Sequence, residues 1–506
     1  MSESLNGFNM VLALTESAVN SQFATIFKDG FIDPSKAVLP QNVAWDIPDG
    51  RGTIKAVLGA PKVSFMPNNN NYQNATFILS LLSGTFETYT IDTKSNTPTV
   101  KLSKKAISNW TVGFVVDLTK MAFGTAARNT AKTVGAINDK AHTALANYSD
   151  NLFDVNALIF DFASANIAAF DPNCTSLPGL TPDDQISLSN ALTVYFKKER
   201  KQPFIIAIHA SSKKPAATAT GVAPTLVPTG VSFTTFGNST KPAQGQIGSL
   251  STLNYLTTTD SHASLPAVPN GVFTAPFVTD NKSSGQLLIS RASFVENYIL
   301  KDFGKNLRAK FIPTGPRHFV SKNPSFPGIS YYHDYGTFAP SVTGKGNTIV
   351  TTNATLSQDK SEINFTGTIL LKASYAIQFI WRGTWTVWRQ ISFNGKVSIV
   401  PSADSHSINT KCDNFSFTNA VTTRNHKDLG ANVDEWFTFG TIESMIDKQL
   451  NSITGNMRNW VERILDEGTS EIPNVFIPPT GDNYSMSPLN FNDSGDLVIN
   501  VNIETK

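Results

Sequence analysis

The histidines and carboxylates are the side chains that could bind a metal or catalyse a reaction, and their spacing matches no known motif. Asp260-Ser261-His262 contains the residue types of a nucleophilic triad. Sequence neighbours on one strand or turn cannot adopt the triad geometry, so we interpret this segment as a polar loop. His318 and His333 lie without metal-ligand spacing. We therefore expect a non-enzymatic protein without catalytic residues or a metal site.

Nucleotide-binding and esterase motifs are also missing from the sequence. Gly344-Lys345-Gly346 lacks the spacing of a phosphate-binding loop, and no Gly-X-Ser-X-Gly elbow occurs. We expect no cofactor. Asp183 and Asp184 are predicted to begin a helix, where carboxylates complement the helix dipole. The basic run Lys197–Lys201 is predicted to end that helix in solvent, with contact to acidic lipid headgroups as the alternative.

Composition excludes several classes of protein. The chain has 506 residues, enough for one large domain or two or three ordinary ones, and 40% of them are apolar, which excludes disorder throughout. There are 41 basic and 39 acidic residues, so the net charge of +2 gives no electrostatic case for nucleic-acid binding. Two cysteines exclude a disulfide framework, while a single bridge between Cys174 and Cys412 stays open.

Targeting signals are not evident. The start, Met1-Ser2-Glu3-Ser4-Leu5, lacks the basic region and continuous apolar core of a secretory signal. No window approaches eighteen apolar residues, so we expect no transmembrane segment. These features predict a soluble protein that is cytoplasmic or secreted by a signal-independent route.

The elements that must position any site are strands in the first part of the chain, interrupted by a few helices. Phe8–Leu14 is predicted as a strand, followed by a helix with Thr15 as its N-cap and its end at Asp29-Gly30. Apolar residues follow Thr15 at helical spacing. Further strands are predicted at Thr53–Leu58, Val63–Phe65, Ala75–Tyr89 (two strands meeting at Ser83-Gly84), Trp110–Leu118, Asn156–Phe162, Phe204–His209 and Val231–Phe236.

The second part of the chain is predicted to begin with a helix over 290–304. Residues 315–425 alternate apolar and polar side chains between turn residues such as Asn394-Gly395, which indicates antiparallel strands. A helix is also predicted over 185–200, before the Thr/Pro-rich stretch 211–250. The terminal segment Leu497–Ile503 is predicted as a strand.

A long helix is predicted over 441–465. From Ile446 to Ile464, apolar residues recur at steps of three and four on one face. Twenty-five residues make a helix of roughly 37 Å, whose apolar stripe needs an equally long partner surface. We expect a twisted sheet of the same chain to curl around it, with a helix from another chain as the alternative.

Several segments in order resemble the tubular lipid-binding (TULIP) superfamily. Within it they most resemble the clostridial forty-seven-kilodalton and OrfX proteins encoded beside botulinum neurotoxins. The segments that carry the resemblance are Phe8–Asn20, Leu188–His209, Leu253–Leu256, Leu287–Leu300, the helix over 441–465, and Phe476-Ile477-Pro478-Pro479 with the terminal strand.

The resemblance implies an elongated α+β fold in which a highly curved antiparallel β-sheet wraps around long α-helices in two lobes. We expect residues 1–285 to form the N-terminal lobe and residues 286–506 the C-terminal lobe. The first lobe would hold the initial strand and helix, a sheet and the stretch 211–250. The second would hold the helix over 290–304, the antiparallel strands over 315–425, the long helix over 441–465 and the terminal strands.

The resemblance also implies a function. We expect a non-enzymatic protein that binds a lipid or another hydrophobic ligand and serves as an accessory protein of a toxin complex. The expected partners are the toxin or sister accessory proteins, with peripheral membrane contact. The alternatives are a structural component of a toxin assembly without bound lipid and a membrane-active insecticidal protein. The residues expected to line an apolar channel between helix and sheet are Val19, Phe23, Leu450, Ile453 and Met457.

Overall fold

The computed structural model describes most of the chain. The described residues are 5–32, 38–65, 73–92, 99–199, 203–213, 226, 228–237, 250–259, 273, 276–278, 283–294, 311–313, 329–340, 346–356, 362–378, 382–401, 408–417, 421–426 and 475–504. The predicted helix over 441–465, residues 295–304 of the predicted helix over 290–304, and Asp260-Ser261-His262 lie outside them.

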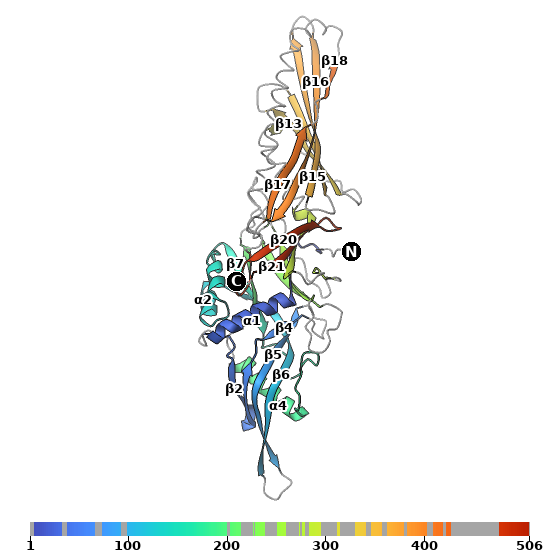
Figure 1. The fold of residues 1–506 in the computed structure, drawn as a ribbon. Helices are drawn as coiled ribbons and strands as arrows, with labels where there is room; N and C mark the ends of the chain where they lie inside the picture. The colour runs from blue at the N-terminus through green and yellow to red at the C-terminus, as the bar shows by residue number, and fades with distance from the viewer. Residues whose placement is uncertain are drawn as a thin grey trace.

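An eight-stranded antiparallel sheet makes up the lower part of the molecule in Figure 1. Its strand order is β19-β8-β7-β6-β5-β3-β2, and β4 also pairs with β5. The strands are β2 (Asn42–Ile47), β3 (Gly52–Leu58), β4 (Lys62–Ser64), β5 (Asn74–Asp92), β6 (Thr99–Ala122), β7 (Phe153–Asp161), β8 (Ile205–Ser212) and β19 (Phe476–Ile477). This sheet curls into a half-barrel, which confirms the predicted curved sheet.

A six-stranded antiparallel sheet in the middle of the molecule joins the two ends of the chain (Figure 1). Its strands, in spatial order, are β20 (Tyr484–Phe491), β21 (Leu497–Ile503), β11 (Gly285–Ile289), β1 (Met10–Thr15), β10 (Thr252–Thr258) and β9 (Gly230–Phe236). Because β1 is central and covered on both faces, all six of its residues are buried. The predicted division at residues 285 and 286 stays a prediction.

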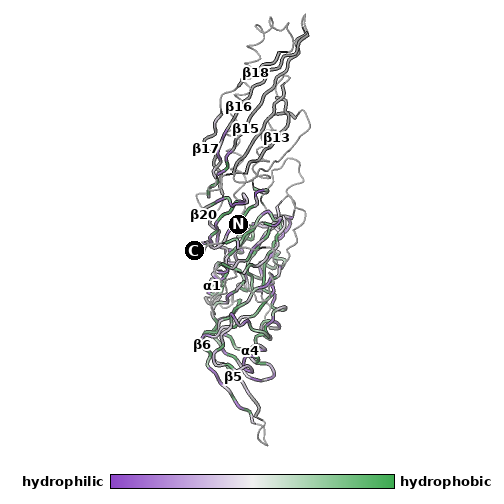
Figure 2. Tube along the Cα trace, turned by 90° about the vertical axis from the view of Figure 1, so that its right-hand side faces the viewer, coloured by the Kyte–Doolittle hydropathy of each residue, from purple (hydrophilic) through white to green (hydrophobic). Residues whose placement is uncertain are grey.

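A seven-stranded antiparallel sheet forms the upper end of the elongated molecule (Figures 1 and 2). Its strands are β12 (Phe311–Pro313), β13 (Ile329–Pro340), β14 (Gly346–Leu356), β15 (Glu362–Gln378), β16 (Arg382–Pro401), β17 (Ile408–Phe417) and β18 (Val421–His426). They confirm the antiparallel strands predicted over 315–425. Asn394-Gly395 is not a turn, because it lies inside β16 where the register with β17 shifts.

The described helices are short. They are α1 (Glu16–Ile32), α2 (Thr125–Thr133), α3 (Asp139–Leu145) and α4 (Pro182–Val194), with a 3-10 turn η2 (Pro48–Gly50) and a π-helical turn η3 (Tyr195–Glu199). Thr15 Oγ1 caps α1 by accepting from the Ala18 amide at 3.2 Å. The helix continues two residues past the predicted end at Gly30. Among the described residues, no helix has the length and apolar character to cross a membrane.

The pairing of β5 with β6 corrects one prediction. Ser83-Gly84 is not a turn between two strands, because β5 continues through it to Asp92. Gly84 has φ of +144°, and a Cβ atom there would lie 2.0 Å from the carbonyl oxygen of Lys55 on β3. Glycine is needed here because the backbone of β3 approaches that of β5 closely, next to a β-bulge. In the sequence, such a glycine looks the same as a glycine in a turn.

The alternating pattern of β6 explains how the eight-stranded sheet covers its core. Val112, Phe114, Val116 and Leu118 are buried on the inner face, as the alternation predicts. Leu188 of α4 belongs to the same core. Figure 2 shows hydrophobic residues along the strands of the body that contains α1 and α4.

Candidate functional site: the apolar interior between the sheets

One continuous apolar core lies between the inner faces of the eight-stranded and six-stranded sheets and includes α1 and α4. We call it the interior. Met10, Leu12 and Leu14 of β1 face it. Val11 and Ala13 alternate with them and pack on the opposite face of the six-stranded sheet. The period of two along β1 thus separates two cores.

Phenylalanine side chains fill the part of the interior beside α4. The Phe77 ring centroid lies 5.2 to 5.7 Å from five other phenylalanine rings, and the ring pairs include edge-to-face arrangements. The rings around it belong to Phe114, Phe160, Phe162, Phe196 and Phe204. This region of the interior is a packed aromatic cluster.

Two of the predicted channel residues lie in the interior. Val19 and Phe23 on α1 are 2% and 5% exposed, and the Phe23 ring lies 6.0 Å from that of Phe160 on β7. The helix therefore faces the sheet with the predicted side chains. Their role in ligand binding stays a prediction. Leu450, Ile453 and Met457 lie outside the described residues.

Two polar side chains of α1, one turn apart, replace a neighbouring strand at the edge of β4. Asn20 Oδ1 accepts from the Val63 amide at 2.7 Å, and its Nδ2 donates to the Val63 carbonyl at 3.0 Å. Glu16 Oε2 accepts from the Phe65 amide at 2.7 Å. Glu16 and Asn20 are four residues apart and therefore lie on one face of the helix. The distance between them along the helix matches the distance between the Val63 and Phe65 amides, which are two residues apart on an extended strand. The contacts fix α1 against the sheet.

Burial changes the acidity of two groups near this contact. Glu16 is fully buried, and desolvation raises the pKa of its carboxyl to about 8 against the opposing effect of the Phe65 hydrogen bond. Cys174 is a free thiol and therefore forms no disulfide bridge with Cys412. Burial, with the negative charges of Asp171 and Glu16, raises the pKa of this thiol to about 12. Such a thiol is a poor nucleophile at neutral pH.

A polar site lies within the interior where the two sheets meet. His209 on β8 is 3% exposed, and neither ring nitrogen has a hydrogen-bond partner among the described residues. Its ring centroid lies 6.5 Å from that of Tyr255 on β10, whose hydroxyl is also unpartnered there. Phe476 on β19 is the cross-strand partner of His209, and its ring centroid lies 5.5 Å from that of Tyr255.

Lys120 on β6 adds a charge to this site from an exposed position of the strand, close enough to act on the His209 imidazole. Its cross-strand partner, Leu158, belongs to the interior, and its Nζ donates to the carbonyl of Val231 on β9 at 3.0 Å. Lys120 thus spans from one sheet to the other. Burial, with a smaller contribution from the Lys120 charge, lowers the pKa of His209 to about 3. The imidazole is therefore neutral at physiological pH. We call His209, Tyr255 and Lys120 the interior polar site.

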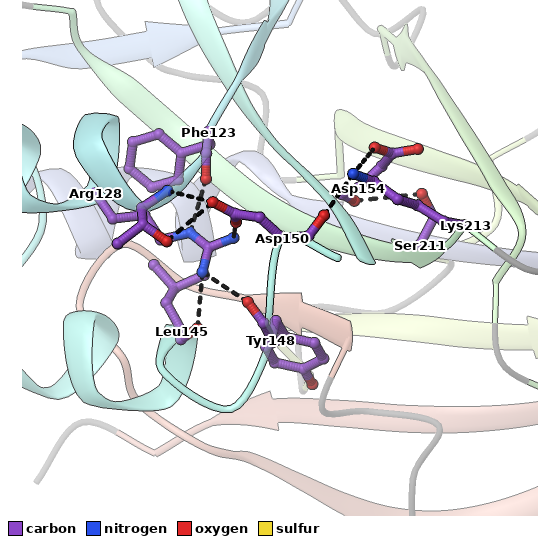
Figure 3. Close-up of polar contacts among 9 residues, drawn as sticks. Phe123, Arg128, Leu145, Tyr148, Asp150, Asp154, Ser211 and Lys213 are labelled. Atoms are coloured by element: carbon purple, nitrogen blue, oxygen red, sulfur yellow. Dashed lines mark hydrogen bonds and ion pairs between the residues drawn. The ribbon is translucent and has the colours of Figure 1, made fainter. Parts of the chain in front are cut away.

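Figure 3 shows a second polar network, centred on Arg128 of α2, outside the interior. Arg128 is 5% exposed, and its guanidinium donates to the carbonyls of Phe123 (2.7 Å), Leu145 (3.1 Å) and Tyr148 (2.8 Å). It also pairs with Asp150 at 2.8 Å. Because these partners belong to the protein, Arg128 ties α2, α3 and the following loop together and offers no site for an external anion.

The same network continues to Lys213, the residue that follows β8. Asp150 Oδ2 accepts from the amide and hydroxyl of Thr125, both at 2.9 Å, and the Asp150 carbonyl accepts from Lys213. Lys213 lies 3.4 Å from Asp154. We interpret this network as structural. The buried residues of α2 are Arg128 and Ala131, so the arginine takes part in the packing of this helix.

The remaining predicted chemistry residues do not converge. Asp184 forms the capping box of α4 with Thr181, as predicted for a helix start, and Lys105 pairs with it at 2.6 Å. His333 lies in β13, and His318 is outside the described residues. Within the part of the chain that the structure describes, no three His, Cys, Asp or Glu side chains gather as a metal ion would need.

Known structures supply the comparison for this fold. The chain is similar to the crystal structure of P47 of Clostridium botulinum E1, with a TM-score of 0.53, 10% sequence identity, and coverage of 99% of this chain and 100% of that one. A second match is lipopolysaccharide binding protein, with a TM-score of 0.29, 10% identity and 99% coverage of both chains. No protein-family model matches the sequence, and no curated protein matches it. The likeness to P47 confirms the predicted fold.

Proposed function

We propose that this protein is a non-enzymatic binding protein that holds a lipid or another hydrophobic ligand in its interior. The observation that carries the proposal is the interior polar site, in which the polar atoms of His209 and Tyr255 lie among apolar side chains and have no hydrogen-bond partner in the described part of the chain. Buried polar groups normally have hydrogen-bond partners, and a bound molecule with polar and apolar parts would supply both kinds of contact. The fold shared with P47 and the resemblance to tubular lipid-binding proteins support the same proposal.

The finer proposal is a role as an accessory protein of a toxin complex, with the toxin or sister accessory proteins as partners. It rests on the likeness of the fold to P47 alone. A second candidate function is a structural component of such an assembly without bound lipid. The aromatic cluster around Phe77 favours this candidate, because side chains already fill that part of the interior.

We also propose the place of peripheral membrane contact. Beyond Thr88, which pairs with Gly52 at the end of β3, β5 and β6 form a two-stranded ribbon at the lower end of the molecule (Figure 1). Val100 and Leu102 on this ribbon are 69% and 51% exposed. An isolated ribbon has no core for them to stabilise. Lys104, two residues further along the strand, is 60% exposed and pairs with Glu87 at 2.8 Å, and this combination of exposed apolar and basic side chains fits the interface of an anionic bilayer.

A lipid-transfer assay tests the function. Vesicles of phosphatidylcholine with phosphatidylserine and a self-quenched fluorescent lipid are mixed with the protein, and dequenching reports uptake. We expect stoichiometric uptake. No uptake, together with the absence of lipid in solvent extracts of the purified protein, would favour the lipid-free structural component.

The same assay tests the ribbon. Val100→Ser with Leu102→Ser is expected to slow uptake several-fold from these vesicles while the unfolding midpoint stays unchanged, because both side chains are exposed. Ile186→Ser on α4, a residue that is 59% exposed, is the matched control and should transfer lipid at the wild-type rate. Equal rates for both variants would contradict the ribbon's role.

A further inference from the structure

Two polar side chains on facing sheets, His209 and Tyr255, are buried away from water. His209 is 3% exposed and Tyr255 is 1% exposed, and their polar atoms have no hydrogen-bond partner among the described residues. Leaving a buried donor or acceptor unpaired costs stability. Leu or Phe at these positions would avoid the cost. The arrangement therefore needs an explanation other than folding.

The donors of this site suit an anionic, oxygen-rich group. The neutral imidazole of His209 offers one donor and one acceptor, and the Tyr255 hydroxyl offers a donor. Lys120 uses one ammonium hydrogen on the Val231 carbonyl, at 3.0 Å, and an ammonium carries three. Around His209 and Tyr255 the interior is apolar, with the Phe476 ring centroid 5.5 Å from that of Tyr255, whereas Lys120 is exposed and pairs across the strands with the buried Leu158.

We infer that His209, Tyr255 and Lys120 bind the carboxylate or phosphate headgroup of a lipid whose hydrocarbon chain lies in the interior. The inference rests on the proposed function and adds a ligand class to it: single-headgroup anionic amphiphiles rather than neutral apolar molecules. The site draws its residues from both sheets. A bound headgroup would therefore link β6 and β8 to β10 as a further hydrogen-bonded contact.

Paired fluorescent probes test this inference. Parinaric acid and its methyl ester share one hydrocarbon chain and differ only in the headgroup charge. We expect wild-type protein to bind the acid at least about tenfold more tightly than the ester, since charge-assisted hydrogen bonds strengthen only the acid. Lys120→Met and Tyr255→Phe should bring the ratio toward one without weakening the ester. Lys132→Met on α2 and Tyr89→Phe on β5, at exposed positions outside the interior, are the matched controls and should retain the wild-type ratio.

A second readout separates a ligand site from a structural role. Without ligand, Tyr255→Phe and His209→Leu should raise the unfolding midpoint, because each removes an unpartnered buried polar group. A lowered midpoint for both would indicate that these groups stabilise the fold and would overturn the inference.

The outcomes also separate the inference from the proposed function. Equal binding of acid and ester by the wild-type protein would overturn the headgroup site alone and leave the lipid-binding function intact. Binding of neither probe would overturn both. Inorganic phosphate is the headgroup without a chain, and we expect it not to displace parinaric acid. Displacement by inorganic phosphate would identify a free-anion site and overturn the lipid assignment.

Discussion

Glu16 couples the contact between α1 and β4 to pH. Its carboxyl is buried at the first residue of the helix and accepts a hydrogen bond from the Phe65 amide at 2.7 Å. Burial raises its pKa to about 8, so the folded protein retains a proton there that the unfolded chain releases near pH 4.5. Because the folded state binds more protons, stability falls as the pH rises from 4.5 to 8. His209, with its pKa lowered to about 3, has the opposite effect below about pH 6.5.

We predict that the free energy of unfolding decreases between pH 6.5 and 8, a window in which Glu16 titrates and His209 does not. The slope for one such group is up to about 1.4 kcal/mol per pH unit. Glu16→Gln keeps a neutral side chain at all pH values and should flatten the slope. Urea unfolding at several pH values measures it. Glu87→Gln, at a surface position where Lys104 lowers the pKa, is the control and should keep the wild-type slope. An unchanged slope in Glu16→Gln would contradict the assignment.

At the scale of elements, the structure predicts that Asn20 holds α1 on the edge of β4. Asn20→Leu removes both hydrogen bonds to Val63 and leaves its amide and carbonyl without their side-chain partner. We expect a loss of about 1–3 kcal/mol in stability and faster hydrogen exchange at the Val63 amide. Thr25→Ala on the same helix removes an exposed bond to the helix backbone and is the control. Slow exchange at Val63 in Asn20→Leu would disprove this role.

Sequence periodicity predicted elements well where burial is regular. Leu497–Ile503 matches β21 residue for residue, and the alternating residues of β6 face the interior as expected. The turns predicted at Gly84 and Gly395 were wrong, because a close approach of two strands and a register shift use the same residue as a turn.

The site itself was harder to predict. His209 and Tyr255 lie on different sheets and are 46 positions apart, so no local pattern connects them.

At the scale of the whole molecule, the six-stranded sheet connects the parts. It contains strands from both ends of the chain and lies between the eight-stranded and seven-stranded sheets (Figure 1). Buried residues Ile363 and Ile399 at the base of the seven-stranded sheet belong to the same core as the interior. A ligand in the interior would therefore contact the element that links the two ends of the molecule.

Native mass spectrometry of the purified protein tests the central claim, that the interior holds lipid, most directly. The account predicts a population heavier than the 54.8 kDa chain by the mass of a lipid. Collisional activation or solvent extraction should release that mass as an identifiable amphiphile. A single species at the mass of the bare chain, both after purification and after incubation with anionic vesicles, would contradict the account.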